Sequence, residues 1–126
     1  MNNKIVVLIP CFNEELTISK VIKDFQNALP TAIIYVFDNA SHDETSAEAK
    51  KAGARVYFEP NKGKGNVIRR MFSDIEADIY IIVDGDNTYE ANKSVQMVDM
   101  LINENLDMVV ATRKTKNSDG EYRWGH

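Results

Sequence analysis

Two aspartates separated by one glycine, Asp84 and Asp86, follow directly on the apolar run 79–83. The run is short and rich in β-branched residues, so it predicts a strand that is buried on both faces. Carboxylates fit at the end of such a strand, because there the backbone leaves the core and meets water. Oxygen ligands in that position suit a hard cation such as Mg²⁺ or Mn²⁺. The alternative is that residues 84–87 form only a polar turn, since Asp and Gly are common in turns.

A second group of residues with chemical potential is the pair of lysines Lys62 and Lys64, which alternate with Gly63 and Gly65. Two cations, next to glycines that let the backbone approach a ligand closely, suit a diphosphate. The spacing is not that of a P-loop, and no G-x-G-x-x-G follows the first apolar run, so NAD is not indicated. The alternative is a solvated turn.

The elements that must position these residues alternate along the chain. Apolar runs predict strands, and apolar residues at helical spacing predict helices between them. Strands are expected at 4–9, 32–37, 55–58, 79–83 and 108–111. Helices are expected at about 13–29, 41–52, 67–75 and 95–102. The alternation predicts an α/β fold, a Rossmann-like and mostly parallel sheet with helices on both faces.

Several element boundaries follow from single residues. Pro10 is expected to end the first strand because proline cannot donate to a sheet ladder. Asn13 has the position of a helix N-cap, and Pro30 is expected to stop that helix. Ser41 opens a capping-box spacing, and Gly53 lies where a helix C′ residue should.

The polar clusters all fall on one edge of the predicted sheet. They follow the first strand (10–15), the second (38–43), the third (61–65) and the fourth (84–90). Ligands of parallel sheets lie outside the carboxyl ends of the strands, where the strand order reverses. Turns without function would be expected at both edges, so the one-sided pattern favours a site. Asp38, at a strand end, is expected to be freer than Ser41 or Glu44 to accept hydrogen bonds from a nucleobase or ribose.

Composition narrows the class of protein. The chain has 126 residues, 44% of them hydrophobic and 27% charged, which is typical of one soluble domain. A formal charge of −4 argues against general binding to nucleic acid. The single cysteine, Cys11, excludes an internal disulfide and is expected to pack rather than react. No signal peptide or membrane span is evident, so a cytoplasmic protein is expected.

Taken together, four motifs resemble those of family 2 glycosyltransferases, the inverting enzymes of GT-A fold. They are residues 9–15 (IPCFNEE), 38–43 (DNASHD), 61–65 (NKGKG) and 84–86 (DGD). The order and the spacing match, and the resemblance extends to about Arg113. The chain is similar to bacterial polyprenyl-phosphate sugar transferases, which share the Gly-Lys-Gly loop.

The resemblance implies a site for a nucleotide-diphosphate sugar, linked to UDP or GDP, and a role in cell-envelope polysaccharide synthesis. The residues it implies for donor binding are Pro10, Asn13, Glu15, Asp38, Lys62, Gly63, Lys64, Asp84, Asp86 and Arg113. Asp86 matches the acid that binds Mg²⁺ or Mn²⁺ on the diphosphate. The implied reaction is a single displacement at the anomeric carbon, onto an acceptor such as a polyprenyl phosphate or a glycan. In a longer protein the site would lie at the inner face of the membrane.

Two departures from the family limit what carries over. Residues 86–90 (DNTYE) differ from the dolichyl-phosphate mannose type, so the acceptor is not implied. The family's acceptor half and its general base normally lie beyond residue 126. We therefore expect a donor-binding domain at 1–113 and a polar tail at 114–126, with exposed apolar surface that favours homo-oligomers. The alternatives are a sugar-phosphate nucleotidyltransferase and a non-catalytic nucleotide-sugar-binding fragment.

Overall fold

The computed structural model describes residues 4–83, 96 and 108–110. In these residues one parallel sheet has the order β3-β2-β1-β4-β5. The strands are β1 (Ile5–Cys11), β2 (Ile33–Asp38), β3 (Arg55–Phe58), β4 (Ile79–Ile82) and β5 (Met108–Val110). The helices are α1 (Ile18–Ala28), α2 (Thr45–Lys51) and α3 (Lys64–Asp74). The predicted α/β fold is confirmed, and the strand order reverses between β1 and β4.

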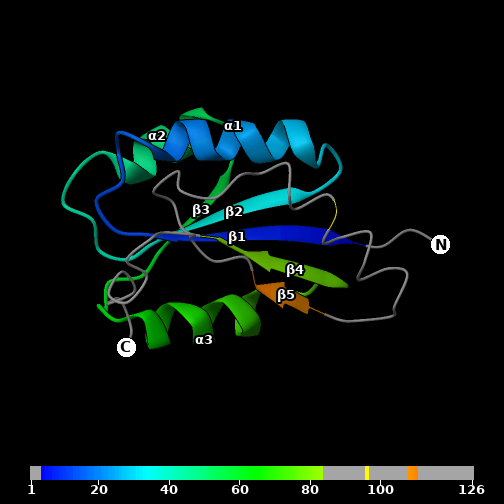
Figure 1. The fold of residues 1–126 in the computed structure, drawn as a ribbon. Coiled ribbons are helices and arrows are strands. Elements are labelled where there is room, and N and C mark those ends of the chain that lie inside the picture. Colours follow the sequence, from blue (N-terminus) through cyan, green and yellow to red (C-terminus); the bar gives the residue numbers. More distant parts are fainter. Residues whose placement is uncertain (1–3, 84–95, 97–107, 111–126) are drawn as a thin grey trace, which may run out of the picture.

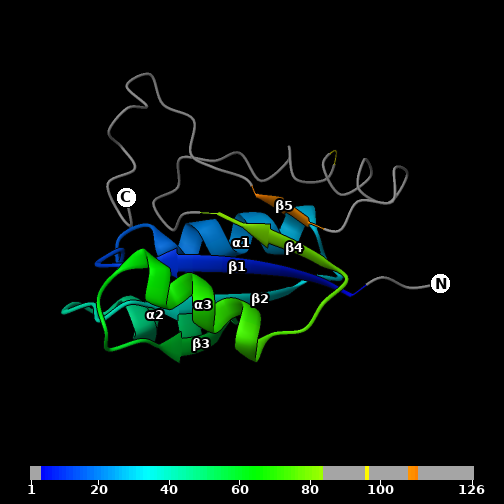
Figure 2. The same ribbon diagram turned by 90° about the horizontal axis from the view of Figure 1, so that it is seen from below.

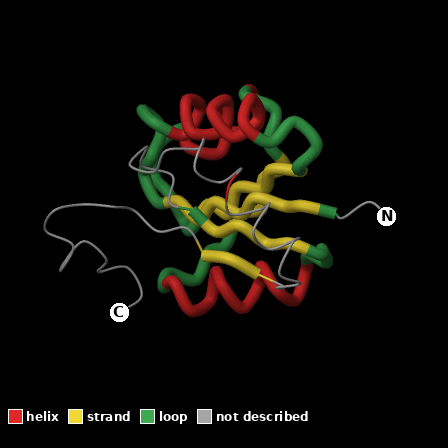
Figure 3. Tube along the Cα trace, turned by 45° about the vertical axis from the view of Figure 1, so that its right-hand side comes forward, coloured by secondary structure: helices red, strands yellow, loops and turns green. Residues whose placement is uncertain are grey.

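The helices cover both faces of the sheet. α1 and α2 lie on one face and α3 on the other, as Figure 1 shows, and in Figure 2 α3 lies in front of the sheet with α1 behind it. Figure 3 shows the strands between the two helical layers. Successive side chains of a strand point to opposite faces. Val7 and Ile9 of β1 therefore pack in the cluster with α1, whereas Val6 and Leu8 pack in the cluster with α3.

Pro10 does not end β1, contrary to the expectation from its missing N–H. The strand continues to Cys11, and Pro10 is paired with Phe37 of β2. The carbonyl of Cys11 accepts from the amide of Asn39 on the β2 side, at 2.8 Å. Because backbone polar groups alternate in direction along a strand, the nitrogen of Pro10 faces the β4 side. There the pairing has already ended at Leu8 and Ile82, so no donor is needed.

Two predicted helix starts are wrong. α1 begins at Ile18, and its N-cap residue is Thr17. Asn13 lies four residues before Thr17 and has a φ of 53°. α2 begins at Thr45, four residues after Ser41. The polar groups of Asn13 and Ser41 contact each other's loops, so they do not cap these helices.

Gly53 confirms the predicted end of α2. It has a φ of 103°, and its amide donates to the carbonyl of Lys50 at 3.0 Å. The amide of Ala54 donates to the carbonyl of Ala49 at 3.1 Å. This pair of bonds is a Schellman motif, which satisfies carbonyls at the helix end. The end of α1 at Ala28, before Pro30, also agrees with the prediction.

The predicted loop 60–65 is shorter than expected, because α3 already begins at Lys64 and includes Gly65. Gly63, with a φ of 127°, is its N-cap residue. The expected helix at about 95–102 lies outside the described residues except for Gln96. In the described part of the chain, no helix is long and apolar enough to cross a bilayer.

Candidate functional site

The loops after β1 and β2 are joined by hydrogen bonds between residues far apart in the sequence. The amide of Asn13 donates to Oγ of Ser41 at 2.8 Å, and the amide of His42 donates to Oδ1 of Asn13 at 2.9 Å. The left-handed backbone of Asn13 turns the chain so that both groups of one residue face the second loop. Asn and Asp tolerate this left-handed conformation better than most residues, which explains why an asparagine occupies position 13.

Asp43 links the same two loops a few residues further on. Its Oδ1 accepts from the amide of Thr45 at 2.9 Å and from the hydroxyl of Thr45, and its Oδ2 accepts from the amide of Glu15 at 3.3 Å. The amide of Glu14 donates to Oγ1 of Thr45 at 2.9 Å, and the amide of Glu44 donates to Oε1 of Glu15 at 3.0 Å. Asp43, rather than Ser41, thus satisfies the first amide of α2.

The hydrogen bonds to Asp43 also set its ionisation. Burial alone would raise the pKa of this carboxyl, but the donors of Thr45 and the Glu15 amide favour the charged form. Together they hold the pKa of Asp43 below its ordinary value of 3.8. The Asp43 carboxylate therefore stays charged to a lower pH than an ordinary aspartate would.

Asp38 is not the freer acceptor that we expected. Its side chain is only 1% exposed, and both oxygens are in use. Oδ1 accepts from the amide of Ser41 at 3.0 Å, and Oδ2 accepts from the hydroxyl of Ser46 at 2.5 Å. The strand end that we expected to expose Asp38 is covered by the loop that Asp38 itself holds. A contact of Asp38 with a base remains a prediction.

Asn39 joins the end of β2 to the loop after β3, a role that the sequence did not indicate. Its Nδ2 donates to the carbonyls of Glu59 and Asn61, both at 3.0 Å, and its Oδ1 accepts from the amide of Gly63 at 3.0 Å. The residue is 2% exposed. A buried amide side chain with three such bonds is well satisfied. The sequence signal for this role was the position of Asn39 directly after Asp38, at the end of a predicted strand.

The loop after β3 carries the first of the two predicted phosphate-binding lysines. Lys62 is exposed, and its Nζ lies 4.3 Å from the centre of the Phe12 ring. The His42 ring meets the same phenyl ring edge-on, with centroids 6.4 Å apart. The side chains of Lys62 and His42 thus both contact Phe12 at the carboxyl edge.

The remaining predicted site residues differ in what the structure says of them. Pro10 is buried within β1, and Cys11 is buried beside it, as expected for packing. The backbone of Lys64 opens α3. Asp84, Asp86 and Arg113 lie outside the described residues. The last described residue before them, Val83, is buried, and its amide donates to the carbonyl of Leu8 at 3.1 Å.

The predicted metal has no complete set of ligands within the described part of the chain. There, no group of three His, Cys, Asp or Glu side chains is arranged to hold an ion. Several carboxylates at this edge, including those of Asp38 and Asp43, are already used on backbone amides. Asp86, the predicted ligand, follows the end of β4 outside the described residues.

The sheet is parallel, and the polar loops lie at its carboxyl edge beside the reversal of strand order between β1 and β4. These features are typical of α/β domains that bind ligands at the carboxyl ends of their strands. The model of the family "Glycosyl transferase family 2" matches residues 6–126, so the chain belongs to this family. The resemblance stated from the four motifs is thereby confirmed.

Two relatives illustrate the range of similarity. Protein RfbJ of Shigella flexneri is 55% identical over 122 residues, which are 97% of this chain and 95% of that protein. Glycosyltransferase AglJ of Haloferax volcanii is 37% identical over 110 residues, which are 86% of this chain but 36% of that protein. The chain thus spans nearly all of the first relative and about a third of the second.

Solved structures agree with the fold. Glucosyl-3-phosphoglycerate synthase from Mycobacterium tuberculosis has a TM-score of 0.67 and 28% identity, over 83% of this chain and 42% of that chain. Another structure of that enzyme, in complex with Mn²⁺, UDP and glucosyl-3-phosphoglycerate, has a TM-score of 0.61 and 29% identity. That match covers 67% of this chain and 34% of the synthase chain.

Proposed function

We propose that this protein binds a nucleotide-diphosphate sugar at the carboxyl edge of the sheet and takes part in transfer of the sugar. The observation that carries the proposal is the set of hydrogen bonds that joins the ends of β1, β2 and β3 there. Asn13, Asp43 and Asn39 join three loops beside the reversal between β1 and β4. Ligands of open parallel sheets bind at this position.

The donor class is supported by two different kinds of observation. The synthase that shares the fold binds UDP and Mn²⁺, as the description of its complex states. In this chain, Lys62 stands at the same edge with its charge exposed, as a diphosphate would require. UDP-linked donors are therefore the first class to test, with GDP-linked donors as the second.

Asp84 and Asp86 would complete the site from the continuation of β4. Carboxylate oxygens suit Mg²⁺ or Mn²⁺, and Asp86 is the proposed ligand. When bound, such a cation neutralises charge that develops on the departing nucleoside diphosphate. Lys62 and Lys64 would bind the same diphosphate, and Arg113 is proposed to meet an anion. The reaction would be a single displacement with inversion, onto a polyprenyl phosphate or a glycan.

The test is a calorimetric titration of the protein with UDP, GDP and CDP, each with and without Mn²⁺. We expect binding of UDP or GDP that strengthens with Mn²⁺, and we expect Asp86→Ala to abolish the metal-dependent part. Asp24→Ala is the matched control, because Asp24 lies on the outer surface of α1 in an ion pair with Lys20. Equal Mn²⁺-dependent affinity of the Asp86→Ala variant and the wild type would refute the proposed metal ligand, and no binding of any nucleotide would refute the proposed function.

The two alternatives are distinguished by chemistry. A sugar-phosphate nucleotidyltransferase would need a glycine-rich loop with an arginine after β1, and residues 12–15 (FNEE) contain neither. A non-catalytic nucleotide-sugar-binding protein would bind the donor without turnover. Incubation with UDP-glucose, Mn²⁺ and a polyprenyl phosphate, followed by detection of glycosylated product, separates this alternative from a transferase.

A further inference from the structure

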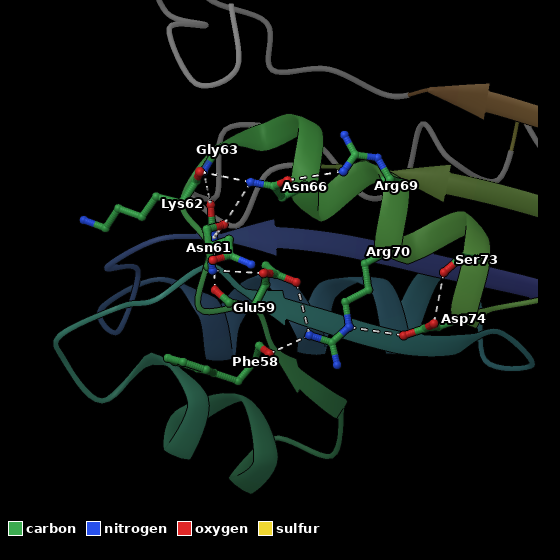
Figure 4. A network of polar contacts seen from close by, with 11 residues as sticks. Phe58, Glu59, Asn61, Lys62, Gly63, Asn66, Arg69, Arg70, Ser73 and Asp74 are labelled. Carbon is green, nitrogen blue, oxygen red and sulfur yellow. Dashed lines mark hydrogen bonds and ion pairs between the residues drawn. The ribbon is translucent and has the colours of Figure 1, made fainter.

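Arg70 connects α3 to the end of β3. Its Nη1 donates to the carbonyl of Phe58 at 2.6 Å and to Oε1 of Glu59 at 3.3 Å, and its Nε donates to Oδ2 of Asp74 at 3.1 Å. Figure 4 shows the guanidinium between these partners. The guanidinium also lies over the ring of Tyr57, 5.6 Å from its centre. A planar guanidinium with several fixed donors suits such multiple contacts, whereas a lysine ammonium does not.

Glu59 carries the effect of Arg70 further. Its side chain is 10% exposed, and Oε2 accepts from the amide of Asn61 at 2.9 Å. One carboxylate oxygen therefore faces α3, while the other holds the loop after β3 (Figure 4). Without the Arg70 guanidinium, the Glu59 carboxylate would be buried without its cation, which costs free energy. The ion pair with Arg70 and the bond to the Asn61 amide therefore depend on each other. Within the described residues, the hydrogen-bond partners of Arg70 are Phe58, Glu59 and Asp74, and none lies in the loop 61–63.

The loop 61–63 is thus held from two sides of the sheet edge. Asn39, directly after β2, binds the carbonyl of Asn61 and the amide of Gly63, and Glu59 binds the amide of Asn61. From α3, Nδ2 of Asn66 adds weaker, exposed bonds to the carbonyls of Asn61 at 3.4 Å and Lys62 at 3.2 Å. Lys62 lies between these anchored positions. The orientation of its side chain depends on the backbone on both sides of it, so loss of either anchor would loosen the position of the lysine.

We infer that Arg70, acting through Glu59, is a positioning residue that fixes the loop 61–63 in the conformation in which Lys62 meets the donor diphosphate. The inference deepens the proposed function and rests on it. It gives a residue within α3, the helix that directly follows the loop, a role in donor affinity, although Arg70 itself need not touch the donor.

The test compares Arg70→Met with the wild type by two measurements. Amide hydrogen exchange, followed residue by residue by NMR, reports the loop without any ligand. Calorimetry with UDP and Mn²⁺ reports the affinity. We expect the Asn61 amide to exchange about three- to tenfold faster and the Kd for UDP to rise by a similar factor, the equivalent of one lost hydrogen bond. The Gly63 amide, bound to Asn39, should change less.

Matched variants separate positioning from a general loss of stability. Asp74→Ala removes another partner of the same guanidinium, and Lys20→Met breaks a comparable i,i+4 pair on α1. Both should leave the Asn61 amide and the UDP affinity unchanged. Arg70→Lys should restore only part of the affinity, because one ammonium cannot reproduce the forked contacts. If Arg70→Met does not fold, Glu59→Gln breaks the ion pair with little change of shape and is expected to give the same loop-specific effect.

The outcomes decide the inference and the proposed function separately. Unchanged exchange at Asn61 in a folded Arg70→Met variant would overturn the inference, even if wild-type UDP binding is strong. Faster exchange with unchanged UDP affinity would overturn it too, because the loop would then not govern the donor. A wild type that binds no nucleotide would remove the proposed function, and with it the donor role of Arg70, whatever the exchange rates.

Discussion

Replacement of Asn39 by alanine is the sharpest test of how the site is built. The side chain makes three hydrogen bonds of 3.0 Å to Glu59, Asn61 and Gly63 and is 2% exposed. Each such bond contributes about 1 kcal/mol net, and an unpaired buried partner costs about 1–3 kcal/mol. The three together predict a loss of about 3 kcal/mol in the free energy of unfolding, reduced where water can reach the exposed Asn61.

Urea unfolding followed by circular dichroism measures this loss, provided that the slope of the transition is unchanged. Asn66→Ala is the control. Asn66 is also an asparagine that donates to loop carbonyls, those of Asn61 at 3.4 Å and Lys62 at 3.2 Å, but it is only half-buried on α3 and both bonds are open to solvent. We expect that variant to stay within about 0.5 kcal/mol of the wild type, as is usual for surface substitutions.

A third variant, Asn39→Asp, keeps the shape of the side chain but replaces the donor Nδ2 by an oxygen. That oxygen would face the carbonyls of Glu59 and Asn61, so the loss should be at least as large as for alanine. The reasoning is refuted if Asn39→Ala and Asn66→Ala lose the same free energy. It is also refuted if Asn39→Asp is as stable as the wild type.

Three further predictions concern the same edge. Gly63→Ala should destabilise the fold by ~1–2 kcal/mol because of its φ of 127°, whereas Gly65→Ala, in open space on α3, should stabilise it by ~0.5–1 kcal/mol; urea unfolding of both variants checks this. Asp38→Ala should weaken metal-free UDP binding by ~1–3 kcal/mol in calorimetry, since the loop after β2 loses its anchor. Because the pKa of Asp43 is lowered in the folded protein, the unfolded chain binds a proton at this carboxyl first on acidification. The stabilisation of the fold by the Asp43 carboxylate is therefore present above pH 3.8 and is lost below it. The stability difference between wild type and Asp43→Asn, measured by unfolding at several pH values, should shrink as the pH falls through that range; a constant difference would contradict it.

The sheet could be predicted from the sequence because burial leaves a local pattern. Runs such as 79–83 contain consecutive apolar residues only if both faces of the strand are covered, and this holds wherever the partners come from. The polar clusters likewise follow the strands, so their common edge was predictable. Neither conclusion required knowledge of which residue contacts which.

The helix starts and the contacts of the site were not predictable in the same way. Asn13 and Ser41 have the residue types of N-caps, but their polar groups bind a loop 28 residues away. Asn39 contacts Gly63 across 24 residues, and Arg70 contacts Glu59 across 11. No local period reports such pairings. Only the fold brings these residues together.

The contacts also divide the polar residues of this edge by what they leave for a ligand. Asp38, Asn39 and Asp43 use their side-chain oxygens on backbone amides, and the two aspartates also use theirs on hydroxyls of α2. A ligand would have to compete with these bonds, which hold the loops. The ammonium of Lys62 instead rests on the ring of Phe12, a contact worth about 0.5–1 kcal/mol at an exposed position. A phosphate oxygen offers a stronger, charge-assisted hydrogen bond. The proposed donor binding at Lys62 would therefore have to replace only a weak contact, and the loops that place the lysine would stay intact.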